Sequence, residues 1–276
     1  MTYEEEKSSD NLTYIVSLEG RKRLLCILFK DNIISAALLI LKSRNTNYLA
    51  MLDSTGFHRG HVRHFVLNSI KNLKGLLVCF SHPKDELIFV KNKFKNCLGP
   101  LKLFEFWKFI FKKRCENCLD DKCYLKTWSN FDSSNCIPFK NINEIQNFKD
   151  DPKSKLLKNF GHRKPSLSEL FNGLLARSDF VKGGLLFSYC NASLSSNENL
   201  GFENKKFTSD HEIKKAMKFL RCCDFSTISD AQKSSSAFVE KFKIDTENMC
   251  YVAFEEIKRT EENECAIFRP KQRDIK

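Results

Sequence analysis

Two adjacent aspartates, Asp150 and Asp151, stand directly before Pro152 and Lys153. Two carboxylates beside an amine are compatible with a surface turn, with a pair of metal ligands, or with an acid–base site. In an acid–base site the pair matters because two nearby carboxylates resist joint ionisation, which raises the pKa of one of them. The segment alone does not choose among these alternatives, so the choice depends on the rest of the chain.

A second pattern suited to chemistry is the segment YLAMLDSTGFHRGHVRHF at residues 48–65. An apolar run passes through turn-forming residues into the start of a helix that carries Arg59, His61 and Arg63. Helix N-termini offer N–H groups and the positive end of a dipole, and Gly60 permits close backbone approach, so the segment suits a phosphate. The alternative is an ordinary strand–turn–helix corner. A P-loop is excluded because its GxxxxGK[ST] pattern is absent.

Four histidines, His58, His61, His64 and His82, raise the possibility of a metal ligand or a catalytic base. No carboxylate stands at a spacing that would partner them. We therefore interpret them as neighbours of phosphate-binding basic residues, and we expect none of them to be the catalytic base.

Four cysteines, Cys115, Cys118, Cys123 and Cys136, lie close together in the chain. Four thiolates at this spacing are compatible with a structural zinc, which would leave no open position for catalysis. The second pair lacks the CxxC spacing of zinc ribbons, so zinc remains an alternative and no metal is expected to take part in the chemistry.

Composition and charge limit the class of protein. The chain has 276 residues, 42% of them hydrophobic, and a formal net charge of +12, which predicts a globular fold and an acidic partner. Cys26, Cys79 and Cys190 stand singly in apolar runs and are predicted to be buried free thiols, which indicates the cytosol or the nucleus. The acidic N-terminus is no signal peptide, and the longest apolar stretch is too short to cross a bilayer.

Alternating apolar segments and helical stripes predict a mixed α/β fold. Residues 114–150 are expected to be irregular, residues 191–207 to be a polar loop, and the tail from 255 to be disordered. Strands are predicted at 24–29, 33–41, 48–52, 75–80, 85–90 and 183–190, and helices begin near Gly60, Pro100, Ser166, Ser209 and Asp230.

The order of four motifs along the chain resembles a known family. LDS at 52–54, Arg63, HPKDELIF at 82–89 and LFEFWKF at 103–109 resemble the coenzyme A core of CBP-type histone acetyltransferases. The resemblance implies a central, mostly antiparallel or mixed sheet flanked by helices.

Three later segments resemble the fungal branch of these enzymes, the histone H3 lysine acetyltransferases of the regulator of Ty transposition family. They are DDPK at 150–153, SLSELFNGLLARSDF at 166–180 and FLRCCDFSTISDA at 219–231. The resemblance implies one acetyltransferase domain over 1–276, with an acetyl-CoA core at about 24–113, a cysteine-bearing loop at 114–149, a substrate-side segment at 150–254 and a charged tail at 255–276.

The resemblance also implies which residues contact acetyl-CoA. Leu52, Asp53 and Ser54 would contact the pantetheine arm, and Arg63 would be the main charge partner of the phosphates. The remaining predicted contacts are Arg59, Gly60, His61 and Val62 at the phosphates, and Phe80, Lys84, Cys97, Leu98 and Phe106 along the cleft.

For catalysis the resemblance implies roles for Asp151, Asp150 and Trp107, and it implies that Lys153 is acetylated by the enzyme itself. A lysine substrate must lose its proton before it attacks the thioester, because its ordinary pKa is about 10.4. Asp151 would accept that proton, and Trp107 would pack against the acetyl group. Trp107 is equally compatible with a core aromatic, and the aspartates with a cap before Pro152.

Three positions depart from the family pattern: Leu87 replaces a tyrosine, Phe106 stands where a tryptophan is common, and Lys155 replaces an arginine. The expected function is transfer of acetyl from acetyl-CoA to a lysine of histone H3, in complex with histone H4, in the nucleus, with links to chromatin, transcription regulation and DNA damage. An acidic histone chaperone would present the basic substrate to the basic enzyme. The alternative is a zinc-stapled, basic nucleic-acid-binding protein without enzymatic activity.

Overall fold

A computed structural model describes most of the predicted elements. The described residues are 13–43, 46–81, 88–92, 98–116, 124–129, 152–176, 184–190 and 205–245. The charged tail predicted from residue 255 lies outside them. Among the described residues, the strands form one eight-stranded sheet in the order β6-β7-β5-β4-β3-β2-β1-β8.

The sheet is mixed and mostly antiparallel, as expected from the sequence. β1 to β4 pair antiparallel in chain order, β4 and β5 pair parallel, β7 pairs antiparallel with β5 and β6, and β8 joins β1 in parallel. The strands are β1 (Thr13–Glu19), β2 (Arg23–Lys30), β3 (Ile33–Ser43), β4 (Thr46–Ser54), β5 (Gly75–Ser81), β6 (Tyr124–Ser129), β7 (Gly184–Cys190) and β8 (Lys205–Phe207).

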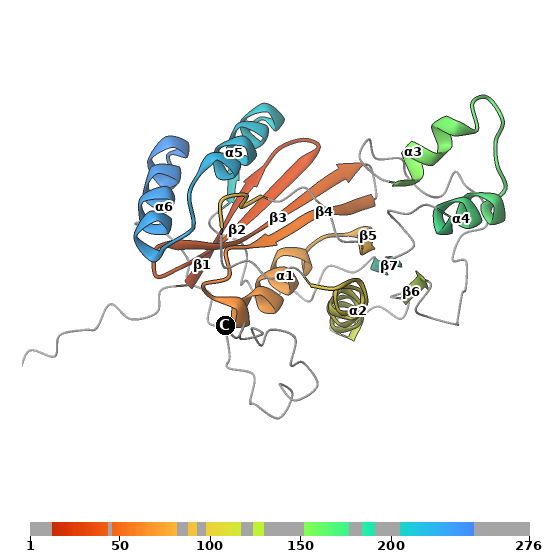
Figure 1. Cartoon of the computed structure of the whole chain (residues 1–276), viewed down its shortest axis with the longest axis horizontal. Coiled ribbons are helices and arrows are strands. Elements are labelled where there is room, and N and C mark those ends of the chain that lie inside the picture. Colours follow the sequence, from red (N-terminus) through yellow and green to blue (C-terminus); the bar gives the residue numbers. More distant parts are fainter. Residues whose placement is uncertain are drawn as a thin grey trace, which may run out of the picture.

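Helices cover both faces of the sheet (Figure 1). α1 and α2 pack on one face, α5 and α6 pack near β1 to β3 on the other, and α3 packs against α4 at the far end. A short 3₁₀ helix, η1 (Arg59–His61), leads into α1. The helices are α1 (Val62–Ile70), α2 (Pro100–Glu116), α3 (Pro152–Asn159), α4 (Leu167–Leu175), α5 (Asp210–Cys222) and α6 (Ile228–Phe242).

Two hydrophobic cores explain why the central strands are apolar at almost every position. Leu25 and Ile27 belong to the core under α5 and α6, whereas Cys26 and Leu28 belong to the core under α1 and α2. Successive side chains of a strand point to opposite faces, so burial of both faces requires a continuous apolar run. Cys26 and Cys79 are buried free thiols, as predicted, and burial raises the pKa of Cys26 to about 11.

The predicted helix starts are confirmed where the structure describes them. The amide N–H of Glu169 donates to Oγ of Ser166 over 3.2 Å, and the amide N–H of Ser166 donates back to the Glu169 carboxylate over 2.8 Å. This reciprocal pair is a capping box. α3 begins at Pro152, so the two aspartates immediately precede a helix N-terminus, as a cap before Pro152 requires.

Four features of the described chain differ from the predictions. Residues 88–90 were expected in a strand but form a bend, because Ile88 and Phe89 turn into the core under α5 and α6. β6 lies within the segment expected to be irregular, and β8 lies within the expected polar loop. β1 was not predicted, although its residues are almost all buried.

Replacing Gly20 by alanine is expected to lower the free energy of unfolding by about 1–3 kcal/mol, as overpacking does. A Cβ at Gly20 would lie 2.5 Å from Oδ1 of Asp210 and 3.0 Å from Cδ1 of Ile213, at the start of α5. Asp210 cannot move freely, because it also accepts a hydrogen bond from the backbone N–H of Lys22 over 3.0 Å. Urea unfolding measures the loss.

The matched control is Gly60→Ala, because a Cβ there has no neighbour within 4 Å in the described structure. Equal stability losses for the two variants would contradict the steric explanation.

Candidate functional site

The carboxylate of Asp53 joins the end of β4 to the segment 88–89. Asp53 is 5% exposed, and its Oδ2 accepts hydrogen bonds from the backbone N–H groups of Ile88 (2.8 Å) and Phe89 (3.0 Å), while Oδ1 accepts from Ser54 N (2.8 Å). Both carboxylate oxygens therefore bind backbone groups of the protein. Asp53 positions this strand end, and its contact with a cofactor stays a prediction.

The neighbouring side chain, Leu52, lies on the opposite face of the sheet. It packs against the core under α1 and α2, which also includes Phe106 and Trp107 and is flanked by Val62 and Leu98. Five predicted site residues therefore belong to or border one hydrophobic core, although different roles at the cofactor and the acetyl group were predicted for them. Their convergence depends on tertiary packing, because they span residues 52–107 in the chain.

Trp107 is 4% exposed and Phe106 is 5% exposed. Their rings meet edge to face with centroids 5.3 Å apart, and Trp107 also contacts Phe111 at 6.3 Å. In this arrangement Trp107 is a core aromatic of α2, which was the alternative to its predicted role at the acetyl group. Its contact with an acetyl group stays a prediction.

A sharp corner connects β4 to η1. The hydroxyl of Ser54 donates to the carbonyl of Ser35 (3.1 Å) and accepts from the N–H of Gly56 (3.1 Å), and Gly56 has a φ of 86° that favours glycine. Thr55 is fully buried and also bonds to the backbone of β3 through its N–H. These bonds fix the direction in which the chain enters η1.

The corner brings η1 against the turn between β2 and β3. Nζ of Lys30 lies 3.4 Å from Nε2 of His61, and Nδ1 of His58 lies 2.7 Å from Oγ of Ser35. Nε2 of His58 is 3.6 Å from the carboxylate of Asp31. An ammonium has only donors, so Nε2 of His61 is the acceptor and its ring is neutral in this arrangement.

Both histidines have a pKa below the ordinary value. For His58 and His61 the largest cause is burial, followed by the ammonium of Lys30, and Asp31 acts in the opposite direction. The pKa of His61 is also lowered by His58 and His64. Neutral rings are therefore favoured near pH 7, although the surroundings carry basic groups.

Acidification is expected to destabilise the protein through these two histidines. The unfolded chain binds protons at an ordinary histidine pKa near 6.5, and the folded state binds them at lower pH. The free energy of unfolding should therefore fall as the pH drops below about 6.5, and level off below the folded pKa values. Urea unfolding at several pH values between 7.5 and 5 measures the slope, which should be shallower for the double variant His58→Asn, His61→Gln. An equal slope for the variant and the wild type would contradict this assignment.

Arg63, in the first turn of α1, lies against α2. Its guanidinium carbon is 4.7 Å from the ring centroid of Phe109, a distance typical of a cation–π contact. The first turn of α1 holds no acidic residue. The dipole of α1 and the half-buried side chains of Arg59 and Arg63 therefore place positive charge at the same end of the helix.

Several predicted site residues lie outside the described part of the chain. The residues outside the described ranges are Lys84, Leu87, Cys97, Asp150 and Asp151. For Phe80, Lys153 and Lys155 the structure describes the backbone but not the side chain. Phe80 lies on β5, and Lys153 is in the first turn of α3. Their predicted roles stay predictions.

Most of the cysteines of the alternative zinc site also lie outside the described part of the chain. Cys115 is at the end of α2 and half-buried, whereas Cys118, Cys123 and Cys136 are not described. Within the residues that the structure describes, no three metal-binding side chains form a group. None of the described helices is long and apolar enough to cross a membrane.

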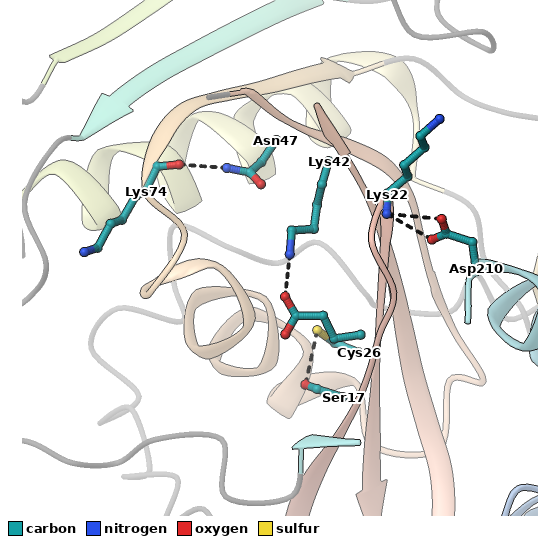
Figure 2. Close-up of polar contacts among 8 residues, drawn as sticks. Ser17, Lys22, Cys26, Lys42, Asn47, Lys74 and Asp210 are labelled. Carbon is teal, nitrogen blue, oxygen red and sulfur yellow. Dashed lines mark hydrogen bonds and ion pairs between the residues drawn. The ribbon is translucent and has the colours of Figure 1, made fainter. Parts of the chain in front are cut away.

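A cavity of about 270 Å³ lies at the opposite end of the central strands (Figure 2). In its wall Lys42 is paired with Glu19, the hydroxyl of Ser17 donates to the sulfur of Cys26, and the amide of Asn47 donates to the backbone of the α1–β5 turn. These groups bind one another, and the volume is below the roughly 300–1,000 Å³ of most ligand sites. We therefore place the candidate site at the Asp53 end.

Sequence reasoning missed Lys30, Asp31 and Phe109 as neighbours of this site, whereas it had placed His58 beside the basic residues predicted to bind phosphate. The predicted hairpin of residues 24–41 could have indicated Lys30 and Asp31, because both lie at or in its turn. β2 and β4 both pair antiparallel with β3, so Lys30 and Ser54 end their strands at the same edge of the sheet.

Comparisons with known proteins support the fold. No family model and no curated protein matches the chain. Among solved structures, Rtt109 from Aspergillus fumigatus superposes with a TM-score of 0.59 and 13% sequence identity, covering 84% of this chain and 91% of that chain. The predicted mixed α/β fold is therefore confirmed: this chain shares the fold of Rtt109.

Proposed function

We propose that the protein is a histone lysine acetyltransferase that transfers the acetyl group of acetyl-CoA to a lysine of histone H3 in the nucleus. The observation that carries the proposal is the arrangement at the end of β4. There Asp53 fixes the strand end, and η1 with Arg59 and His61 leads into the first turn of α1 with Arg63, on a fold shared with Rtt109.

The chemistry of these side chains fits acetyl-CoA as the substrate. Arg59 and Arg63 at the start of α1 suit its phosphates, because guanidinium groups donate to phosphate oxygens in pairs. Leu52 and Leu98 beside the apolar core suit the uncharged pantetheine arm. Phe109 would hold the guanidinium of Arg63 in place through the ring contact described above.

The reaction needs a neutral lysine amine next to the thioester. Asp151 accepts the proton in this proposal, and Asp150 raises the pKa of that carboxyl toward the value a base needs. Trp107 would pack on the acetyl group and donate its indole N–H toward developing charge. No metal takes part in the proposed chemistry.

Lys153 is proposed to be acetylated by the enzyme itself. In this proposal its ammonium, two residues from Asp151 in the chain, would lower the carboxyl pKa and so weaken the base, and acetylation would remove that charge. Lys153→Arg keeps a permanent charge there and is expected to lower kcat several-fold. Steady-state acetyl transfer and mass spectrometry of residue 153 measure the two parts, and an unchanged rate would contradict the regulatory role.

The substrate would arrive with an acidic partner. The enzyme has a formal net charge of +12, and histones H3 and H4 are basic, so direct association is electrostatically unfavourable. An acidic histone chaperone would offset this repulsion, and the rate on H3–H4 should therefore rise when such a chaperone is added.

Calorimetry with acetyl-CoA, followed by acetyl transfer to H3–H4, tests the proposal. We expect micromolar binding to the wild-type protein and at least tenfold weaker binding to Arg63→Ala, because a charge-assisted contact to phosphate is lost. Lys214→Ala, on the exposed face of α5, is the control and should bind as the wild type does. Absence of acetyl-CoA binding to the folded wild-type protein would exclude the proposed function.

A further inference from the structure

Lys30 extends the positive charge around the start of α1 to a second element. It ends β2, far from α1 in the chain, and yet its ammonium lies 3.4 Å from Nε2 of His61. His58 stands beside this pair, with its ring centroid 6.4 Å from that of His61. Two imidazoles and an ammonium from two elements therefore face one another at the strand end.

The two histidines of this group are uncharged near pH 7, although each can bind a proton. Burial and Lys30 hold the pKa of both histidines below the ordinary value, so they are neutral where the other groups are charged. His64 of α1 also lowers the pKa of His61. The carboxylate of the exposed Asp31, in the β2–β3 turn, acts on both His58 and His61 in the opposite direction.

We propose that Lys30, His58 and His61 form an anion-binding group that contacts a phosphate of acetyl-CoA, and that a proton binds to the group together with the phosphate. This inference rests on the proposed function. The step is a proton transfer: a buffer acid in the solvent loses a proton, an N–H bond forms at an imidazole nitrogen, and phosphate oxygens accept hydrogen bonds from that imidazolium and from the Lys30 ammonium.

The physical reason is the charge of the ligand. A phosphate within about 4–6 Å favours the protonated imidazole, so it opposes the effects of burial and of Lys30. The bound phosphate also separates the ammonium from Nε2 of His61, which removes the acceptor role that keeps this nitrogen unprotonated. Binding therefore draws a proton from solution.

The proton is counted by calorimetry with coenzyme A at pH 7.5, in PIPES and in Tris buffers of equal ionic strength. At this pH a phosphate monoester is mostly dianionic, so the ligand itself contributes few protons. The dependence of the measured enthalpy on the ionisation enthalpy of the buffer gives the number of protons. We expect a net uptake of roughly half a proton or more per coenzyme A by the wild-type protein. No uptake, or a net release, overturns the inference.

Variants test which residues take up the proton and whether Lys30 contacts the phosphate. The double variant His58→Asn, His61→Gln keeps polar atoms near the Ser35 and Lys30 partners but cannot be protonated, so its proton uptake should vanish. Lys30→Met keeps the aliphatic stem and should weaken coenzyme A binding about tenfold. The controls, His211→Gln and Lys214→Met, change exposed residues of α5 and should alter neither the proton count nor the affinity.

The outcomes separate this inference from the proposed function. Tight coenzyme A binding with no proton uptake, unaffected by Lys30→Met, overturns the inference and leaves the acetyltransferase proposal standing. Failure of the wild-type protein to bind either coenzyme A or acetyl-CoA overturns both. The wild-type proton count needs no variant, so it decides the question even if a variant does not fold.

Discussion

Asp53→Ala is expected to lower the free energy of unfolding by about 3–5 kcal/mol. The carboxylate accepts three backbone hydrogen bonds, two of them from the buried residues Ile88 and Phe89. Alanine leaves these two buried N–H groups without an acceptor, at about 1–3 kcal/mol each, which accounts for a loss of this size. Urea unfolding of the variant and the wild-type protein gives the difference.

Asp53→Asn separates charge from hydrogen bonding at this position. The amide oxygen can still accept from the two buried N–H groups, so the loss should be smaller than for alanine, about 1–2 kcal/mol. Glu105→Ala, at an exposed position of α2, is the control and should stay within about 0.5 kcal/mol of the wild type. A near-zero effect of Asp53→Ala would mean that residues 88–89 find other acceptors.

Asp151→Asn is expected to lower kcat by roughly 10²–10⁴-fold, the usual contribution of a general base. Asparagine is close in shape to aspartate but cannot accept a proton from the substrate lysine at neutral pH. The Kd of acetyl-CoA should stay within about twofold, since the proposed role concerns the amine and not the cofactor. Steady-state acetyl transfer to H3–H4 with calorimetry measures both quantities.

The neighbouring aspartate provides the matched comparison. In the proposed mechanism the charge of Asp150 raises the pKa of Asp151, so Asp150→Asn should shift the pH profile of kcat to lower pH with a smaller loss at the optimum. Equal losses of kcat for both variants would contradict the distinct roles of the pair. An unchanged kcat for Asp151→Asn would exclude it as the base.

The fold was largely predictable because the signals for its elements are local. The apolar run at 24–29, the stripe that contains Trp107 and Phe111, and the capping box of Ser166 and Glu169 all depend on residues close in sequence. Their order also predicted the fold confirmed by the superposition. β8 escaped prediction because its three residues pair with β1 across most of the chain.

The roles of the predicted site residues stay predictions, and the structure shows only how the described ones are arranged. Leu52, Val62 and Trp107 are on the predicted list, and they do meet on one core. The carboxylate of Asp53, in contrast, binds residues 88 and 89, which form a bend and not the expected strand. The spacing of apolar residues cannot distinguish a short buried bend from a short buried strand. The hydrogen bonds from residues 88 and 89 to Asp53 could therefore not be predicted from the sequence.

The sequence by itself determined most of the described strands and helices and which end of β4 carries positive charge, because periodicity, capping and charge are properties of neighbouring residues. Only the tertiary structure decided that Lys30 meets His61, 31 residues later. That contact requires the register of β2, β3 and β4 and the corner at Gly56 to bring two turns to one edge of the sheet. Hydrogen bonds between distant segments follow from packing, and no local pattern encodes them.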